Sequence, residues 1–462
     1  MTKSYARHGA AALAALFLIG CSTDQPANND ITGADLSSPL LSASQLADPN
    51  GVIVTVNGMG TNGELPSEVT LELQEQGANV LRVDPYSKLA VVVGLKDEAA
   101  LKQLSAVDQV MPNPMLTLHT DQSSAHFFSV NPQQQNLPHI RASNAWATPF
   151  SGGGVNVCII DSGIDDSHPD MAGTVSKAIS YIPGLAPNTD GRGHGTHVAS
   201  TVRTNGIGVA SVASDATLMN ARTFDNAGGG AFTDRLVAAI RWCGREGAHV
   251  INMSLGFSGG LRFLPANQPI FDLLTDAIND VRDGSDPVNS GPGGVVVIAS
   301  AGNDNLRYPS TYAAAVPADL PGVISVGSTL RASNSRSSFS NRGTMVDIWA
   351  PGSAILGVCS TFTSNCLSGT VRQLPSTAGN AGRYMEISGT SMAAPHVAGV
   401  AAIIYGRLGT TRSPEQGARV ENCIKNIARQ AGVVRLLPDP AGARTDALLG
   451  ATAASCAMGL AQ

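Results

Sequence analysis

Three residues stand at glycine-framed turns and are of the types that together can activate a hydroxyl group. Asp161 follows an apolar run at residues 155–160, His194 lies in a GHGTH segment, and Ser391 lies in a GTSMA segment. A serine hydroxyl is a weak nucleophile at neutral pH, so an imidazole must accept its proton while a carboxylate orients that imidazole and stabilises its charged form. Taken singly, the three could also be a turn cap, a core histidine and a helix N-cap. Their joint occurrence favours nucleophilic catalysis.

The segments around these residues predict the scaffold that positions them. Five short, mostly apolar runs are typical of strands buried on both faces, and helical segments at residues 194–202 and 234–245 lie between them. We expect an α/β fold, with a mainly parallel sheet flanked by helices and catalytic groups at the C-terminal edges of the strands. The runs occur at residues 155–160, 216–221, 250–254, 295–299 and 323–326.

The residues after Ser391 are small (AAPHVAGVAA) and predict a buried helix that can pack tightly on every side. Pro395 fits only in a first helical turn, where its missing N–H costs nothing. The helix should therefore begin close to Ser391 and direct its positive N-terminal end at the hydroxyl group.

With the chain order Asp161, His194, Ser391, residues 136–405 resemble the subtilisin-like serine proteases, or subtilases. The resemblance implies that these three residues form the catalytic triad, and that the Asn303 side chain and the backbone N–H of Ser391 form the oxyanion hole. It implies no cofactor for the chemistry. It also implies a set of substrate-binding residues: Gly228, Gly229, Gly230, Phe232, Ser254, Leu255, Gly256, Ala301 and Gly302.

The walls of the implied primary pocket, residues 254–256 and 299–302, contain no charged side chain, and Phe232 would line an outer apolar pocket. We therefore expect substrates with an apolar or aromatic residue before the cut bond.

Two further segments resemble the ligands of a structural calcium site in that family, HPD at residues 168–170 and NGIGV at residues 205–209. Asp170 and Asn205 would supply side-chain oxygens, and Ile207 and Val209 would supply backbone carbonyls. The second loop looks shorter than the family's usual form, so a turn without metal is the alternative.

Residues 51–120 form a compositional unit in front of the larger domain. The order of its elements predicts a split βαβ module, which resembles the subtilase propeptide, an intramolecular chaperone and inhibitor. A generic α+β accessory domain is the alternative, and residues 121–135 would be a processing linker. The predicted elements are strands at 52–56, 80–83 and 89–93, helices at 65–76 and 97–107, and an extended segment at 109–119.

Residues 1–21 have the pattern of an export signal, with Lys3 and Arg7 before an apolar run that is too short to span a bilayer. The ending LIGC resembles the bacterial lipobox, in which Cys21 becomes the lipidated first residue; an ordinary secretory signal is the alternative. Residues 22–50 predict a flexible tether. We expect an exported protein, anchored as a lipoprotein precursor, whose mature form acts in the periplasm, at the cell surface or outside the cell.

Six cysteines remain after Cys21, and an oxidising compartment permits them all to pair. The favoured pairs are Cys359 with Cys366, around a short polar loop, and Cys423 with Cys456, in the C-terminal tail. For Cys158 and Cys243, a bridge and two buried thiols remain equally open.

Two insertions and a C-terminal tail are additional to the segments of a minimal subtilase. Residues 257–294 contain a predicted helix at 270–282, and residues 359–384 immediately precede the Ser391 segment. Residues 406–462 form a C-terminal extension with a helix at 414–431.

The net charge of -6 and the pI near 5.8 provide no basic surface for nucleic acid, so the expected partners are protein or peptide substrates and the chain's own propeptide. The function that these observations favour is an exported serine endopeptidase made as a self-processing zymogen. A catalytically silent lipoprotein that uses the cleft for binding is an alternative. An esterase is another, although the Gly-x-Ser-x-Gly elbow is absent around Ser391.

Overall fold

The computed structural model describes most of the chain between residues 47 and 427. The predicted export signal, most of the tether, most of the processing linker and the end of the C-terminal extension lie outside the described residues. The described residues are 47–85, 87–114, 116–118, 134–140, 142, 146, 149–227, 232–257, 268–308, 315–343, 345–363, 371–373 and 383–427.

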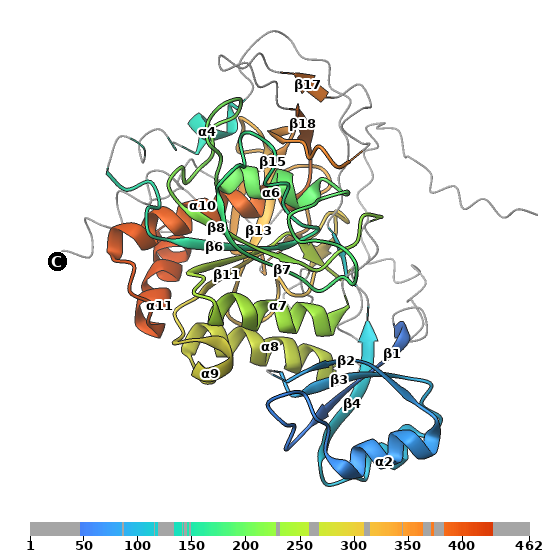
Figure 1. The fold of residues 1–462 in the computed structure, drawn as a ribbon. Coiled ribbons are helices and arrows are strands. Elements are labelled where there is room, and N and C mark those ends of the chain that lie inside the picture. Colours follow the sequence, from blue (N-terminus) through green and yellow to red (C-terminus); the bar gives the residue numbers. More distant parts are fainter. Residues whose placement is uncertain are drawn as a thin grey trace, which may run out of the picture. The chain divides into compact units, whose positions relative to one another are not determined.

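The N-terminal module comprises residues 47–114 and is a four-stranded antiparallel sheet with two helices (Figure 1). Its elements follow the predicted order, and the strands pair in the order β2-β3-β1-β4. Val54 and Leu73 lie in its core. The elements are β1 (Ala47–Val56), α2 (Ser67–Gln76), β2 (Asn79–Asp84), β3 (Leu89–Val93), α3 (Glu98–Lys102) and β4 (Val107–Pro114).

The second helix of this module is shorter than the sequence predicted. Asp97 caps it by accepting hydrogen bonds from the N–H groups of Ala99 and Ala100, but the helix ends at Lys102 instead of residue 107. The Ser105 hydroxyl and the Ala106 N–H instead donate to the carboxylate of Glu68 in α2. This contact with α2 draws the chain out of the helix and into β4.

The larger domain is built on a seven-stranded sheet with the order β15-β13-β11-β9-β6-β8-β7, and all of its pairings are parallel. The predicted α/β fold with a mainly parallel sheet is confirmed. Strands β7 and β15 were not predicted, because β7 is partly exposed and β15 contains Pro351 and Gly352. The strands are β6 (Asn156–Asp161), β7 (Val175–Ser180), β8 (Thr217–Arg222), β9 (Val250–Met253), β11 (Val296–Ser300), β13 (Val323–Leu330) and β15 (Ile348–Ser353).

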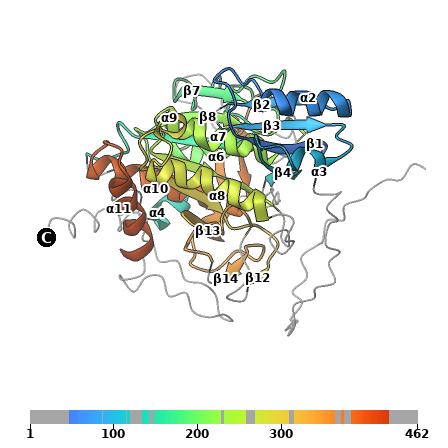
Figure 2. The same ribbon diagram turned by 90° about the horizontal axis from the view of Figure 1, so that it is seen from below.

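Helices cover both faces of this sheet (Figures 1 and 2). Alternate residues of β6 face opposite layers: Val157 belongs to the cluster that contains α6 and α10 residues, and Ile160 to the cluster that contains α7 and α8 residues. This alternation explains why residues 157–160 of β6 are all apolar. The helices are α6 (His194–Val202), α7 (Thr233–Arg245), α8 (Gln268–Asp283) and α10 (Thr390–Leu408), and the first three lie within two residues of their predicted bounds.

Shorter elements surround the sheet. An antiparallel sheet of order β16-β18-β17 leads into α10, and α11 is followed by a π-helical turn at Cys423–Ile427 where a longer helix was predicted. No helix among the described residues is long and apolar enough to cross a membrane. The shorter elements are β5 (Thr117–Leu118), α4 (Asn136–His139), β10 (Leu255–Gly256), α9 (Pro287–Ser290), β12 (Arg307–Tyr308), β14 (Arg342–Gly343), β16 (Ile355–Val358), β17 (Val371–Gln373), β18 (Arg383–Ile387) and α11 (Pro414–Asn422).

A disulfide joins Cys158 of β6 to Cys243 of α7, which resolves the alternative left open by the sequence. Both residues are fully buried, so the bridge ties the central strand to the helix packed on it. Cys359 and Cys423 are also disulfide-bonded. Cys366 and Cys456 lie outside the described residues, so the pairing of those two cysteines stays a prediction.

Candidate active site

The candidate residues gather at the C-terminal edge of three neighbouring strands. Asp161 is the last residue of β6, Ser254 follows β9, and Asn303 lies three residues after the end of β11. These strands are adjacent in the order β11-β9-β6. The edge predicted from the sequence is therefore the place where the polar groups meet.

Asp161 and His194 are in direct contact, with 2.8 Å between Oδ1 of Asp161 and Nδ1 of His194. Each is only 1% exposed, so the contact lies in a low-dielectric environment where its electrostatic strength is high. The close approach of α6 to β6 requires glycine at position 195. A Cβ atom there would lie 2.2 Å from the carbonyl oxygen of Gly163 and 3.1 Å from Cβ of Asp161.

A second buried carboxylate, Asp190, holds the turn that carries His194. Its Oδ1 accepts from the Ser162 hydroxyl at 2.9 Å and the Gly193 N–H at 2.8 Å. Its Oδ2 accepts from the N–H and the hydroxyl of Thr196. Burial raises the pKa of Asp190, while the hydrogen bonds from Thr196 and Gly193 oppose that shift. Sequence reasoning missed this residue, although an aspartate shortly before the GHGTH segment was a visible signal.

Ser391 is the second residue of α10, and its position depends on Pro395. Pro395 is the sixth residue of the helix, so the prediction that it lies in the first turn was wrong by two residues. Because proline has no N–H, it cannot donate to the carbonyl oxygen of Ser391 four residues earlier. The hydroxyl of Ser254 takes over this role at 2.8 Å, and the hydroxyl of Ser391 donates to the carbonyl oxygen of Ser254 at 3.0 Å.

Asn303 is oriented by Thr390, the residue before Ser391. Its side-chain oxygen accepts from the N–H of Thr390 at 2.9 Å and from the Thr390 hydroxyl at 2.8 Å. These bonds engage the acceptor end of the amide, and only its NH₂ end can donate to a substrate oxygen. The sequence indicated Thr390 only as a turn residue, so its role in orienting Asn303 was missed.

Comparisons with known proteins identify the family of the chain. The model of the subtilase family matches residues 152–448. The chain is 32% identical to Subtilisin E from Bacillus subtilis (strain 168) over 357 residues, which cover 76% of this chain and 79% of that protein. It is 33% identical to Thermitase from Thermoactinomyces vulgaris over 299 residues, which cover 64% of this chain and 90% of that protein.

The chain belongs to the subtilase family. It is a serine endopeptidase that acts on protein substrates. Among solved structures, fervidolysin from Fervidobacterium pennivorans, described as a keratinolytic enzyme related to subtilisin, matches with a TM-score of 0.59 and 24% identity. The match covers 82% of this chain but only 57% of the fervidolysin chain, and at this identity it supports the fold alone.

The structure brings together some of the predicted substrate-binding residues of this subtilase. Leu255 and Gly256 form β10, which pairs antiparallel with β5 of the chain's own N-terminal part. Ala301 is fully buried beside the site, and the predicted residues Gly228, Gly229 and Gly230 lie outside the described residues.

Phe232 precedes α7 and is 9% exposed, with the guanidinium of Arg235 at 4.7 Å from its ring centroid. The aromatic ring that was predicted to line an outer apolar pocket therefore makes a cation–π contact. Arg235 was not predicted as a site residue.

Another histidine of the subtilase domain, His396, lies in α10 and is fully buried. Its Nδ1 lies 2.8 Å from the carbonyl oxygen of Met392, so Nδ1 donates and Nε2 accepts from the amide of Asn136 at 2.8 Å. Burial lowers the pKa of His396 to about 4, so the ring is neutral in the physiological range. Both ring nitrogens of His396 are engaged in these core contacts, whereas His194 contacts the carboxylate of Asp161, so His194 is the candidate base.

The residues predicted to bind calcium do not form the oxygen cage that the ion requires. Both carboxylate oxygens of Asp170 accept hydrogen bonds from N–H groups of residues 207–209. Asn205 donates its side-chain N–H groups to the carbonyl oxygens of Pro169 and Ala172. No cluster of three or more His, Cys, Asp or Glu residues suited to a metal occurs in the described part of the chain.

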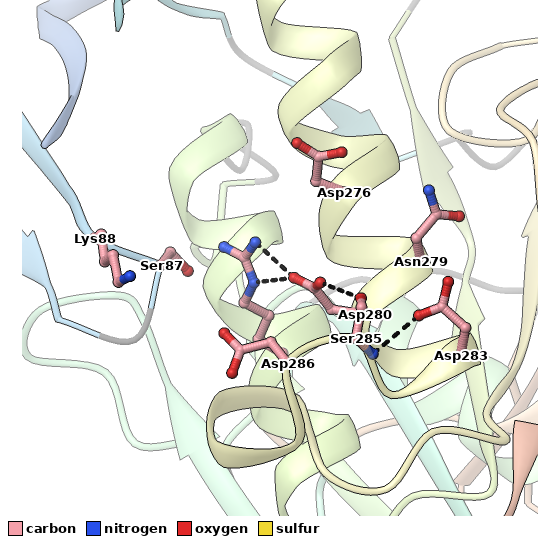
Figure 3. A pocket seen from close by; sticks show the side chains of 9 residues that line it. Ser87, Lys88, Asp276, Asn279, Asp280, Asp283, Ser285 and Asp286 are labelled. Atoms are coloured by element: carbon pink, nitrogen blue, oxygen red, sulfur yellow. Dashed lines mark hydrogen bonds and ion pairs between the residues drawn. The ribbon is translucent and has the colours of Figure 1, made fainter. Parts of the chain in front are cut away.

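A cavity of about 430 Å³ lies between the N-terminal module and helices α7–α9 (Figure 3). Ser87 and Lys88 contribute from the module, opposite four aspartates, of which Asp280 forms an ion pair with Arg241 at 2.8 Å. The lining includes none of the predicted catalytic or substrate-binding residues. We attribute this cavity to the interface between the module and the domain. The aspartates are Asp276, Asp280, Asp283 and Asp286.

The contact between Ser254 and Ser391 leads to a stability prediction. Ser254→Ala removes the hydroxyl that donates to the buried carbonyl oxygen of Ser391, and Pro395 has no N–H to replace it. We therefore expect a loss of about 1–3 kcal/mol in the free energy of unfolding. Chemical denaturation of the full chain in a Ser391→Ala background, which prevents self-digestion, measures this loss. Ser335→Ala removes an exposed hydroxyl and is the control. Equal stability of the two variants would contradict the role assigned to Ser254.

Proposed function

We propose that this subtilase is an exported endopeptidase made as a self-processing zymogen, with Asp161, His194 and Ser391 as its triad. The observation that carries the proposal is the buried 2.8 Å contact between His194 and Asp161, at the same sheet edge as the helix N-terminus that bears Ser391. A carboxylate on Nδ1 fixes the tautomer in which Nε2 can accept a proton.

In the proposed reaction the Ser391 hydroxyl attacks the carbonyl carbon of a peptide bond while Nε2 of His194 accepts its proton. Asp161 stabilises the imidazolium that forms. The carbonyl oxygen becomes an oxyanion, which the N–H of Ser391 and the side-chain NH₂ of Asn303 stabilise. His194 then returns the proton to the leaving amine, and water hydrolyses the acyl-enzyme by the same steps in reverse. This chemistry uses only groups of the chain, so no cofactor takes part.

Reaction with a serine-directed fluorophosphonate tests the triad. We expect the matured wild type to be labelled at one serine, and Ser391→Ala to lose labelling, self-processing and protein digestion together. Ser388→Ala, which removes a neighbouring hydroxyl that accepts from the N–H of Ala354, is the matched control and should stay labelled. An unlabelled wild type would favour a silent binding protein, and a labelled protein that cleaves esters but no protein would favour an esterase.

The N-terminal module and β5 have the contacts expected of a propeptide. Asp234, at the N-terminus of α7, is 1% exposed, and it forms an ion pair with Arg82 and accepts a hydrogen bond from the Asn113 amide at 2.8 Å. Strand β5 adds to β10 as an extended peptide substrate would. These contacts support residues 51–120 as the propeptide, residues 136–405 as the catalytic domain and residues 121–135 as the linker between them.

The register of β5 on β10 predicts the position of self-processing. Leu118 pairs with Leu255, and Thr117 pairs with Gly256. Ser254 directly precedes Leu255, and its carbonyl oxygen accepts the Ser391 hydroxyl, so β5 leads toward the candidate nucleophile. We therefore expect the first cleavage to follow His119.

Mass spectrometry of the earliest products in a maturation time course checks this position. A first fragment that begins at Thr120 is the expected result, and a first cut outside residues 119–135 would contradict the propeptide assignment. The mass of the uncleaved precursor also reports whether Cys21 carries a lipid. That modification is proposed from the sequence alone, because Cys21 lies outside the described residues.

We also propose a preference for apolar or aromatic side chains before the cut bond. The predicted pocket wall, residues 254–256 and 299–302, is buried and uncharged, so a lysine ammonium would lose hydration without gaining a partner. We expect kcat/KM for peptides with Phe or Leu at this position to exceed that for Lys by at least about tenfold. Hydrolysis of matched chromogenic peptides measures the ratio, and a preference for Lys would overturn the assignment.

A further inference from the structure

The loop at residues 205–209 is the place where a structural calcium ion is implied by resemblance to the family, and the fit of its residues can be tested. Calcium requires six to eight oxygen ligands at about 2.3–2.6 Å. The implied donors are the side chains of Asp170 and Asn205 and the backbone carbonyls of Ile207 and Val209. All of them would have to direct oxygen atoms at one point.

The backbone of this loop faces Asp170 with its N–H groups instead. Oδ1 of Asp170 accepts from the N–H of Ile207 at 2.6 Å, and Oδ2 accepts from those of Gly208 and Val209 at 2.9 and 3.2 Å. In a trans peptide unit the N–H and the preceding carbonyl point in opposite directions. The carbonyl of Ile207, which shares its peptide unit with the N–H of Gly208, therefore points away from Asp170.

The other implied ligands are also engaged. The carbonyl oxygen of Val209 accepts from the Thr204 hydroxyl at 2.7 Å. The side-chain oxygen of Asn205 lies 3.4 Å from the guanidinium of Arg203, and its NH₂ group donates to two carbonyl oxygens of the Asp170 segment. A guanidinium beside the implied ligand places a positive charge where the ion would need an anionic environment.

Tyr384 of β18 completes the arrangement. Its hydroxyl donates to Oδ2 of Asp170 at 2.9 Å, and its ring packs edge-on against His168 with centroids 5.3 Å apart. Burial raises the pKa of Tyr384, so the phenol keeps its proton and remains a donor. The ring lies so close to Gly208 that a Cβ atom there would be 2.2 Å from the phenol oxygen.

We propose that Asp170, by accepting hydrogen bonds from the backbone N–H groups of residues 207–209 and from the Tyr384 hydroxyl, replaces the calcium ion that the family resemblance implies at this loop. A carboxylate held by several N–H donors supplies a fixed negative charge that organises the loop. Because Tyr384 belongs to the strand that leads into α10, the same hydrogen bonds connect this loop to the segment before Ser391.

Thermal unfolding of the full chain with Ser391→Ala, which removes self-digestion, tests the proposal. We expect the Tm in 5 mM EGTA and in 5 mM CaCl₂ to agree within about 1 °C, since no ion contributes to the folded state. A rise of more than about 5 °C in CaCl₂ that Asp170→Asn abolishes would overturn the proposal. A rise that persists unchanged in Asp170→Asn would place calcium elsewhere and leave the assignment of this loop supported.

Substitution of Tyr384 provides a test that does not depend on calcium. Tyr384→Phe removes one donor to a buried carboxylate, and we expect a Tm lower by several degrees in both EGTA and CaCl₂. Tyr405→Phe is the matched control, because its buried hydroxyl donates to the carbonyl oxygen of Gly294 at 3.0 Å, away from Asp170. The shift for Tyr384→Phe should shrink when combined with Asp170→Asn, whereas the shift for Tyr405→Phe should be unchanged. Equal shifts for Tyr384→Phe with and without Asp170→Asn would contradict the proposed contact.

Discussion

The parallel register of β6, β9 and β11 is the constraint on which the candidate site depends. Met253 of β9 pairs with Ile160 of β6 on one side and with Ala299 of β11 on the other. Asp161 follows Ile160 and Ser254 follows Met253, so Asp161 and Ser254 lie side by side at the C-terminal edge of the sheet. A slip of one residue would turn each side chain to the opposite face. The site's geometry is therefore set by strand pairing within a sheet buried on both faces.

The sequence predicted those elements whose apolar residues follow a regular pattern, either an unbroken run or one face of a helix. Strands β6, β8, β9 and β11 and helices α6, α7 and α8 lie within two residues of their expected bounds, whereas β13 ends four residues later than predicted. The errors occur where a contact between distant segments decides the outcome. Glu68 ends α3 early by accepting hydrogen bonds from the chain after it, and Pro395 lies deeper in α10 because Ser254 supplies the missing donor. Neither contact can be inferred from the neighbouring residues in the sequence.

The candidate site shows the same limit. The motifs identified Asp161, His194 and Ser391, and the structure brings the first two into contact. The groups that orient the side chains of the site come from distant parts of the chain. Thr390 orients Asn303, which lies 87 residues earlier in the chain, through two hydrogen bonds to its side-chain oxygen. The loop near Asp170 has a composition similar to that of a calcium loop, but the direction of its peptide units decides what it can bind. Composition does not determine that direction.

The distribution of hydrogen-bond donors distinguishes Asp161, the carboxylate of the proposed triad, from its neighbours. Asp165, Asp170 and Asp190 are all fully buried, and both oxygens of each accept hydrogen bonds from backbone N–H or hydroxyl groups. Asp161 is as buried, yet its Oδ2 has no donor among the described residues, while Oδ1 accepts from His194 and the N–H of Ser162. Donors that surround a carboxylate partly screen its charge from other groups. In the proposed mechanism the Asp161 carboxylate, which has fewer such donors, therefore interacts more strongly with the imidazolium that forms on His194.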